Sequence, residues 1–269
     1  GYKPELLVHP SRRERVVNMA TTVDEMANWD KYPTYGVYED MMVGFATDYP
    51  SLCRLDTIGT TTEGRKLLVL TISDNPDLEE AEPEFFYTST MHGDETTGYV
   101  LMLRLIDYLL ENYGADAQVT QLVNNVEILI NPNANPDGTY ASGNSTVTGA
   151  TRGNANYIDI NRNFYDPDDG PHPDGNTWQP ETIAMMDYAR AHSITMSANF
   201  HGGAEVANYP WDTWSRPHAD QEWFDAVSHV YADNAMADGP SGYFTSVSAN
   251  GVTNGYDWYP VAGGRQDFY

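Results

Sequence analysis

Four short runs of β-forming residues, separated by helical patterns, constrain the fold of this chain more than any other feature. Bounded by Gly, Pro or Asn, the runs are residues 67–73, 85–91, 126–131 and 195–200. Apolar residues recur every three or four positions over 96–113, which predicts a helix, and Pro180 opens a second one that extends to about residue 192. Strands that alternate with helices predict an α/β fold with helices packed on a sheet and ligands bound at strand ends.

Two stretches interrupt this alternation and are predicted to be loops. Residues 74–84 are acidic, and residues 133–156 are rich in Gly, Asn, Ser and Thr. Long loops in compact domains are often functional, so we expect the second to lie near the active site. The chain has no internal repeat, and its 269 residues suit one domain.

Charge and cysteine content exclude several classes of function. The net charge of −25 disfavours binding to nucleic acid and to anionic membrane surfaces, although an acidic surface also serves solubility alone. Cys53 is the single cysteine, so neither an intrachain disulfide nor a thiolate zinc site of the structural kind can form. No apolar run approaches the roughly 18 residues of a membrane span, and the first residues do not resemble a signal peptide.

Two histidines and a glutamate follow two of the predicted strands. His92 and Glu95 lie directly after the run that ends at residue 91, and His201 follows the run that ends at residue 200. Imidazole and carboxylate groups suit Zn²⁺, and three protein ligands with one open position make a catalytic site. His-x-x-Glu alone is a weak signal, because an isolated histidine is more often a hydrogen-bonded structural residue. The small residues around His201 favour the metal, because they leave its open face accessible.

A third string, from Arg152 to Phe164, carries guanidinium and amide groups. Asn161 and Arg162 stand side by side and can grip a carboxylate, while Arg152 can stabilise a developing oxyanion. Cleavage beside a free C-terminus needs both functions. A surface salt bridge is the alternative role for Arg162 in so acidic a chain.

At these residues the chain resembles the zinc metallocarboxypeptidases, within which it is similar to the regulatory branch of carboxypeptidase N, E, M and D relatives. Five strings occur in the family's order, beginning at residues 92, 135, 159, 201 and 263. The resemblance covers residues 35 to 269. It implies a mixed, mainly eight-stranded sheet with helices on both faces, in a single α/β domain over 31–269 that follows an N-terminal extension, residues 1–30.

The resemblance also implies the roles of individual residues. His92, Glu95 and His201 match the ligands of one Zn²⁺ per chain, and Asn161 and Arg162 match the pair that binds the substrate's terminal carboxylate. Arg152 matches the residue that polarises the scissile carbonyl. Asp159 matches an acid that accepts the other ring N–H of a ligand histidine, which would fix the tautomer of that ring and strengthen the ligand.

Asp212 is the candidate residue for selecting the substrate's C-terminal side chain. It lies eleven residues after His201, where the regulatory branch has an Asp at the base of the pocket for the substrate's last side chain. A buried carboxylate there would pair with Lys or Arg. The alternative is a loop Asp that follows a Tyr-Pro turn.

These residues together predict a zinc-dependent exopeptidase that removes C-terminal residues, preferably Lys or Arg, from peptides or proteins. A carboxypeptidase for peptidoglycan peptides or other amides is a second reading. The family's general-base Glu follows the Gly263-Gly264 string and matches no residue of 1–269, so the predicted catalytic domain is incomplete at its C-terminus. A non-catalytic zinc-binding or peptide-binding module is the third reading, for a protein that truly lacks this Glu. From acidity and activity we expect a secreted or periplasmic protein.

Overall fold

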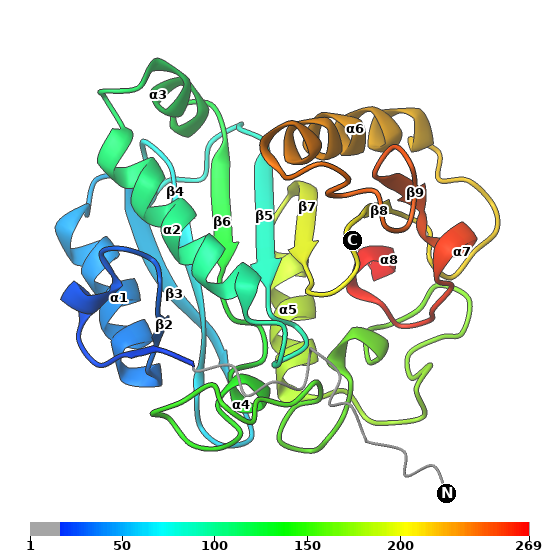
Figure 1. The fold of residues 1–269 in the computed structure, drawn as a ribbon, viewed down its shortest axis with the longest axis horizontal. Coiled ribbons are helices and arrows are strands. Elements are labelled where there is room, and N and C mark those ends of the chain that lie inside the picture. The colour runs from blue at the N-terminus through cyan, green and yellow to red at the C-terminus, as the bar shows by residue number, and fades with distance from the viewer. Residues whose placement is uncertain (1–16, 269) are drawn as a thin grey trace, which may run out of the picture.

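A computed structural model describes residues 17–268. Its centre is a five-stranded mixed sheet in the order β3-β4-β6-β5-β7 (Figure 1). The strands are β3 (Cys53–Thr60), β4 (Lys66–Ile72), β5 (Glu84–Ser89), β6 (Glu127–Asn131) and β7 (Ile194–Phe200). β3, β4 and β6 are antiparallel neighbours, whereas β6, β5 and β7 run parallel. All four predicted β runs are therefore strands of one sheet.

Helices cover both faces of the sheet. One face packs on α1 (Tyr35–Asp48), α2 (Thr97–Asn112) and α3 (Ala117–Val123), and the other packs on α5 (Pro180–Ala191). Successive β4 residues alternate between these cores, since Leu68 and Leu70 face the α1 and α2 side and Val69 faces α5. A strand buried on both faces reads as a continuous apolar run, which is why β4 was recognisable in the sequence. The mixed α/β class is confirmed.

The smaller elements lie around this centre. They are β1 (Met19–Ala20), η2 (Val23–Met26), β2 (Tyr32–Pro33), α4 (Pro136–Thr139), η3 (Ile160–Arg162), β8 (Ala207–Tyr209), α6 (Gln221–Asp238), β9 (Val252–Asn254), α7 (Gly255–Trp258) and α8 (Arg265–Phe268). β1 pairs with β2, and β8 pairs with β9 beneath α6. The family resemblance implied mainly eight strands, but the central sheet of residues 17–268 has five. β1, β2, β8 and β9 lie outside it, because they form two separate two-stranded sheets.

The predicted N-terminal extension falls partly outside the described residues, since 1–16 are not among them. Ala20 and Met26, from the remainder, are buried in the core beside α1.

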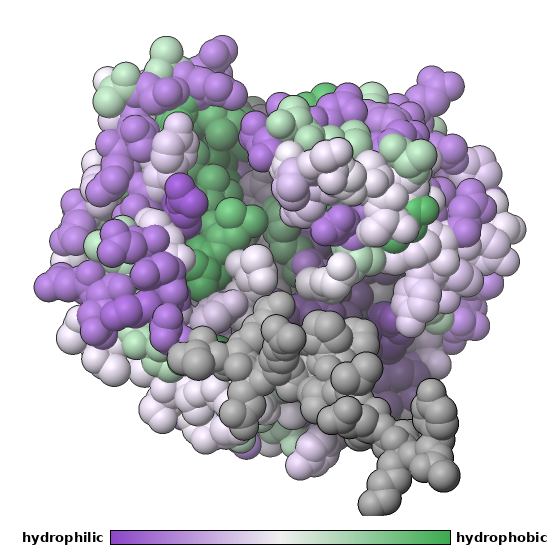
Figure 2. All heavy atoms as spheres, in the orientation of Figure 1, coloured by the Kyte–Doolittle hydropathy of each residue, from purple (hydrophilic) through white to green (hydrophobic). Residues whose placement is uncertain are grey.

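On the face of the molecule seen in Figure 2, apolar surface lies in a hollow between α2 and α6. Among residues 17–268, no helix has both the length and the apolar character needed to cross a membrane.

Candidate metal centre

Two adjacent strand ends bring the predicted ligands together. β5 and β7 are parallel neighbours, with Ser89 opposite Phe200, so the turns that follow both strands lie at one edge of the sheet. After β5 the chain turns sharply at Thr90, whose φ is 59° and whose hydroxyl donates to the Glu95 carbonyl. This turn places His92 and Glu95 side by side, because the Glu95 N–H also donates to the His92 carbonyl.

Gly93 allows this turn to lie against the loop that contains α4. A methyl group at Gly93 would overlap the backbone of Gly138 and Thr139. Asn135 strengthens the contact from the other side, since its amide donates to the carbonyls of Met91 and Arg152 at 3.2 and 3.3 Å. The loop predicted over 133–156 therefore lies under the ligand turn, as expected.

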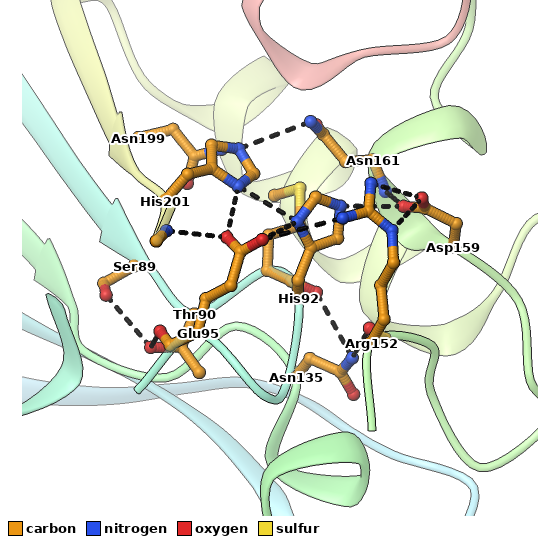
Figure 3. A network of polar contacts seen from close by, with 12 residues as sticks. Ser89, Thr90, His92, Glu95, Asn135, Arg152, Asp159, Asn161, Asn199 and His201 are labelled. Atoms are coloured by element: carbon orange, nitrogen blue, oxygen red, sulfur yellow. Dashed lines mark hydrogen bonds and ion pairs between the residues drawn. The ribbon is translucent and has the colours of Figure 1, made fainter. Parts of the chain in front are cut away.

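The side chains of the three candidate ligands converge (Figure 3). His92 Nδ1 lies 2.9 Å from Glu95 Oε1, and His201 Nδ1 lies 2.8 Å from Glu95 Oε2. The two Nδ1 atoms are 3.1 Å apart. Both rings thus present the same nitrogen to one point beside the carboxylate.

This donor set fits a zinc ion. Ligand atoms about 2.0–2.2 Å from a tetrahedral zinc lie roughly 3.3 Å from one another, only slightly farther than the separations seen here. Two imidazole nitrogens 3.1 Å apart can share one proton at most, whereas a cation between them satisfies both lone pairs. The side chain of His201 is about one-third exposed, which leaves the site open on one side.

Electrostatics favour cation binding at Glu95 and His201, whereas His92 would have to give up a proton. Burial opposes ionisation of Glu95, but hydrogen bonds from His201, His92 and the Gly202 N–H outweigh it and lower the pKa of Glu95. Burial lowers the pKa of His201, which favours its neutral form. The pKa of His92 is raised, because hydrogen bonds to Asp159 and Glu95 overcome the effect of burial.

Asp159 and Arg152 lie behind His92. Asp159 Oδ1 is 3.0 Å from His92 Nε2, and Asp159 Oδ2 accepts from Arg152 Nε and Nη2, both at 2.9 Å. The hydrogen bond to His92 leaves the Nδ1 lone pair of that ring directed toward the other ligands. Arg152 also approaches Glu95 Oε1 at 3.6 Å, and its half-exposed side chain reaches the open side.

The predicted carboxylate-binding pair, Asn161 and Arg162, called here the carboxylate grip, lies on η3 next to the candidate ligands. Asn161 Oδ1 accepts from the Arg265 N–H at 3.0 Å, so the Asn161 amide nitrogen faces His201, 3.4 Å from Nε2. Arg162 Nη1 donates to the Asn161 carbonyl at 2.6 Å. Among residues 17–268 Arg162 makes no ion pair within 4 Å, which argues against the salt-bridge alternative. The amide and the guanidinium are both left with donors for a substrate carboxylate.

The zinc carboxypeptidase family model matches residues 38–269. The chain belongs to the zinc carboxypeptidase family. The structure of thrombin activatable fibrinolysis inhibitor shares the fold, with a TM-score of 0.76 at 18% identity, covering 92% of this chain and 65% of that chain. Carboxypeptidase A from Helicoverpa armigera also shares it, with a TM-score of 0.76 at 20% identity, covering 93% of this chain and 64% of that chain.

Relatives in sequence within the family include carboxypeptidases D, M and N, the branch that the motifs indicated. Carboxypeptidase D of Rattus norvegicus is 40% identical over 237 residues, which cover 83% of this chain and 17% of the relative. Carboxypeptidase M of Mus musculus is 37% identical over 243 residues, covering 86% and 54%. The chain thus spans about a sixth of the first relative and about half of the second.

Asp212, the predicted specificity residue, is buried in this member of the zinc carboxypeptidase family, with 4% of its surface exposed. Its carboxylate accepts from Asn208 Nδ2 at 3.0 Å and from Gln266 Nε2. Burial raises the pKa of Asp212, while these hydrogen bonds and the charge of Arg162 oppose the rise. A methyl group at Gly255 would overlap the carboxylate, so this position requires Gly. Asp212 does lie in the loop that follows Tyr209 and Pro210, but its carboxylate is buried there.

Sequence reasoning missed Tyr259 and Gln266. The guanidinium of Arg162 lies 5.8 Å from the centre of the Tyr259 ring, and that side chain is 56% exposed. A cation over an aromatic face is attracted to it, so Tyr259 orients the guanidinium of Arg162. Tyr259 was not recognisable, since a lone Tyr at a helix end has no distinctive spacing. Gln266 lies within the string that begins at residue 263, but the string by itself indicates no role for it.

Proposed function

We propose that this chain is the catalytic core of a zinc-dependent carboxypeptidase that prefers peptides ending in Lys or Arg. The convergence of His92, Glu95 and His201 at one edge of the sheet carries the proposal. The adjacent Asn161 and Arg162 supply the donors that a terminal carboxylate needs. Cleavage of the last peptide bond requires these two features side by side.

Each residue has a distinct part in the proposed reaction. When zinc is bound, it supplies a Lewis acid and a water of lowered pKa. Arg162 and Asn161 bind the terminal carboxylate and so set the peptide bond before the metal ligands. Arg152 directs its guanidinium at the scissile carbonyl and stabilises the negative charge that develops there. Asp159 keeps the proton on His92 Nε2.

Asp212 supports the preference for basic residues. Its hydrogen-bond partners, Asn208 and Gln266, are neutral amides, so the carboxylate has no counter-charge in direct contact among the described residues. A substrate Lys or Arg would supply one, whereas an apolar side chain would leave the buried charge unpaired. The net charge of −25 would attract such cationic peptides.

Matched peptides that end in Arg, Lys, Leu or diaminopimelate test this function. We expect release of Arg and Lys to dominate, and Asp212→Asn to lower kcat/KM for the Arg peptide by about 30-fold or more, equivalent to roughly 2 kcal/mol. Preference for diaminopimelate would favour the peptidoglycan reading. Zinc and peptide binding without turnover would favour the non-catalytic module. Equal cleavage of Arg and Leu peptides would refute the role of Asp212.

Location and partners follow from the same proposal. Peptide or protein C-termini are the expected partners, and secretion or export to a periplasm stays a prediction. Detection of the protein in the culture medium or the periplasmic extract of the organism that produces it would test the location.

A further inference from the structure

One short segment near the C-terminus, residues 263–267, connects the carboxylate grip to the specificity pocket. On the grip side, the Arg265 N–H donates to Asn161 Oδ1 at 3.0 Å. The Gly263 N–H donates to buried Asp166 at 3.1 Å, and the Gly263 carbonyl accepts from the Phe164 N–H at 3.0 Å. The segment is thus fixed to the residues that would hold the substrate's terminal carboxylate.

Asp267 attaches the same segment to the pocket. Its two carboxylate oxygens accept from the backbone N–H groups of Asp212 and Thr213, at 2.8 and 2.7 Å. Asp267 is 4% exposed, so these bonds are shielded from water. Hydrogen bonds from backbone N–H groups to a buried carboxylate are strong and strongly directional. The backbone that carries the Asp212 side chain is therefore fixed by Asp267.

We infer that Asp267 is a positioning residue, which fixes the Asp212 carboxylate relative to Asn161 and Arg162 and thereby sets the preference for basic C-termini. The inference rests on the proposed function. A substrate residue joins two charges, the terminal carboxylate and the basic side chain, by a chain of fixed length. Its two binding groups on the protein must therefore keep a fixed separation, and segment 263–267 is the connection between them.

The energetic cost of this arrangement argues against a purely stabilising role. Asp267 is buried beside two further acids, Asp212 and Asp166, and this burial raises its pKa to about 7. Like charges in a shielded site repel each other, so burying a neutral side chain there would cost less free energy. What a carboxylate offers at this position, and a neutral amide does not, is two acceptors for two adjacent backbone N–H groups.

The substitution Asp267→Asn tests the inference, because Asn has the same shape but one acceptor oxygen. A displacement of about 1 Å in a binding group can cost as much as 100-fold in rate. We expect the ratio of kcat/KM for the Arg peptide over the Leu peptide to fall by at least about tenfold, through KM of the Arg peptide. Zinc content should stay near its wild-type value, and cleavage of the Leu peptide should fall less than cleavage of the Arg peptide.

A control exists at Asp116, whose carboxylate accepts through one oxygen, Oδ1, from two backbone N–H groups, those of Gln118 and Val119, at the start of α3. Asp116→Ala removes both bonds, so it should lower the melting temperature without changing the Arg/Leu ratio. If both variants changed the ratio equally, general loosening would explain the effect and the inference would be wrong. Should Asp267→Asn fail to fold, Asp267→Glu keeps the charge and moves the oxygens, so the same ratio is read there.

The outcomes separate the inference from the proposed function. A wild-type protein that prefers Arg, with a folded, zinc-loaded Asp267 variant that keeps that preference, overturns the inference and leaves the function standing. A wild-type protein without preference for Arg over Leu overturns both, and this is seen before any variant is made.

Discussion

Replacing Asp159 by Asn should weaken zinc binding without removing any ligand. In the wild type, one oxygen of Asp159 faces His92 Nε2 at 3.0 Å and the other accepts twice from Arg152 at 2.9 Å. The amide has a single oxygen. If that oxygen faces His92, the NH₂ group opposes the Arg152 guanidinium; if it faces Arg152, the NH₂ group opposes the His92 ring N–H.

Either orientation removes one acceptor and the negative charge behind His92. Changes to the hydrogen-bond partner of a ligand histidine cost about 10- to 100-fold in metal affinity, or roughly 1.4–2.7 kcal/mol. The side chain of Asp159 is 26% exposed, so water can replace part of the lost bonding and the lower half of this range is expected.

Zinc affinity would be measured by competition with a chelator of known Kd, at one pH and ionic strength. Asp187→Asn is the control, since Asp187 is 69% exposed on α5 and pairs only with Arg190 at 3.1 Å among the described residues. It removes the same charge away from the site. A Kd for Asp159→Asn within about threefold of both wild type and control would refute the role of Asp159 behind His92.

Three further predictions concern backbone strain, packing and pH. Tyr157 has φ 61° and is 87% exposed, so Tyr157→Gly should relieve about 1–2 kcal/mol of strain while adding about 0.5–1 kcal/mol of unfolded-chain entropy; a net stabilisation of roughly 0.5–1 kcal/mol is expected in urea unfolding, and a loss of stability would contradict it. Gly255→Ala should displace Asp212 and abolish the preference for Arg in peptide assays while zinc content stays normal. Asp267, which faces Asp212 and Asp166, has a pKa raised from 3.8 to about 7, so the native state holds its proton to higher pH than the unfolded chain. The stability that Asp267 contributes should therefore be lost as pH rises from about 4 to 7. In denaturant unfolding across that range, Asp267→Asn should lack this component, and a pH-independent difference from wild type would contradict it.

The parts of the fold that were predictable are those whose burial leaves a pattern. The strands β4 to β7 are apolar and short, and α2 buries one stripe of side chains. α1 was not predicted, because Gly36 and Gly44 weaken its helical signal and its buried face is built from Tyr and Met. α6 was missed for another reason. Ala232 is its single fully buried residue, so its 18 residues show no apolar stripe.

Strand ends predicted the candidate metal ligands, whereas loop residues such as Arg152 and Asp159 were predicted from the motif string and the family resemblance. His92 and His201 lie at the ends of β5 and β7, and parallel neighbours bring such ends together. The order of the strands cannot be read from their patterns, so adjacency had to be assumed. Contacts such as Tyr259 with Arg162 depend on loops whose paths are set by side chains that are distant in sequence.

Buried Asn and Asp side chains give those loops their fixed shape. Asn135 bonds the loop of α4 to the ligand turn, and Asn163 accepts from the Gln179 N–H at 2.8 Å and from Thr182 at 2.9 Å. Both side chains are fully buried. In sequence, such residues suggest flexible loops, yet here each replaces the backbone pairing that a strand would have provided. Their loss would leave buried backbone groups unpaired and shift a loop that carries site residues. Sensitive positions in this protein should therefore include side chains that touch neither metal nor substrate.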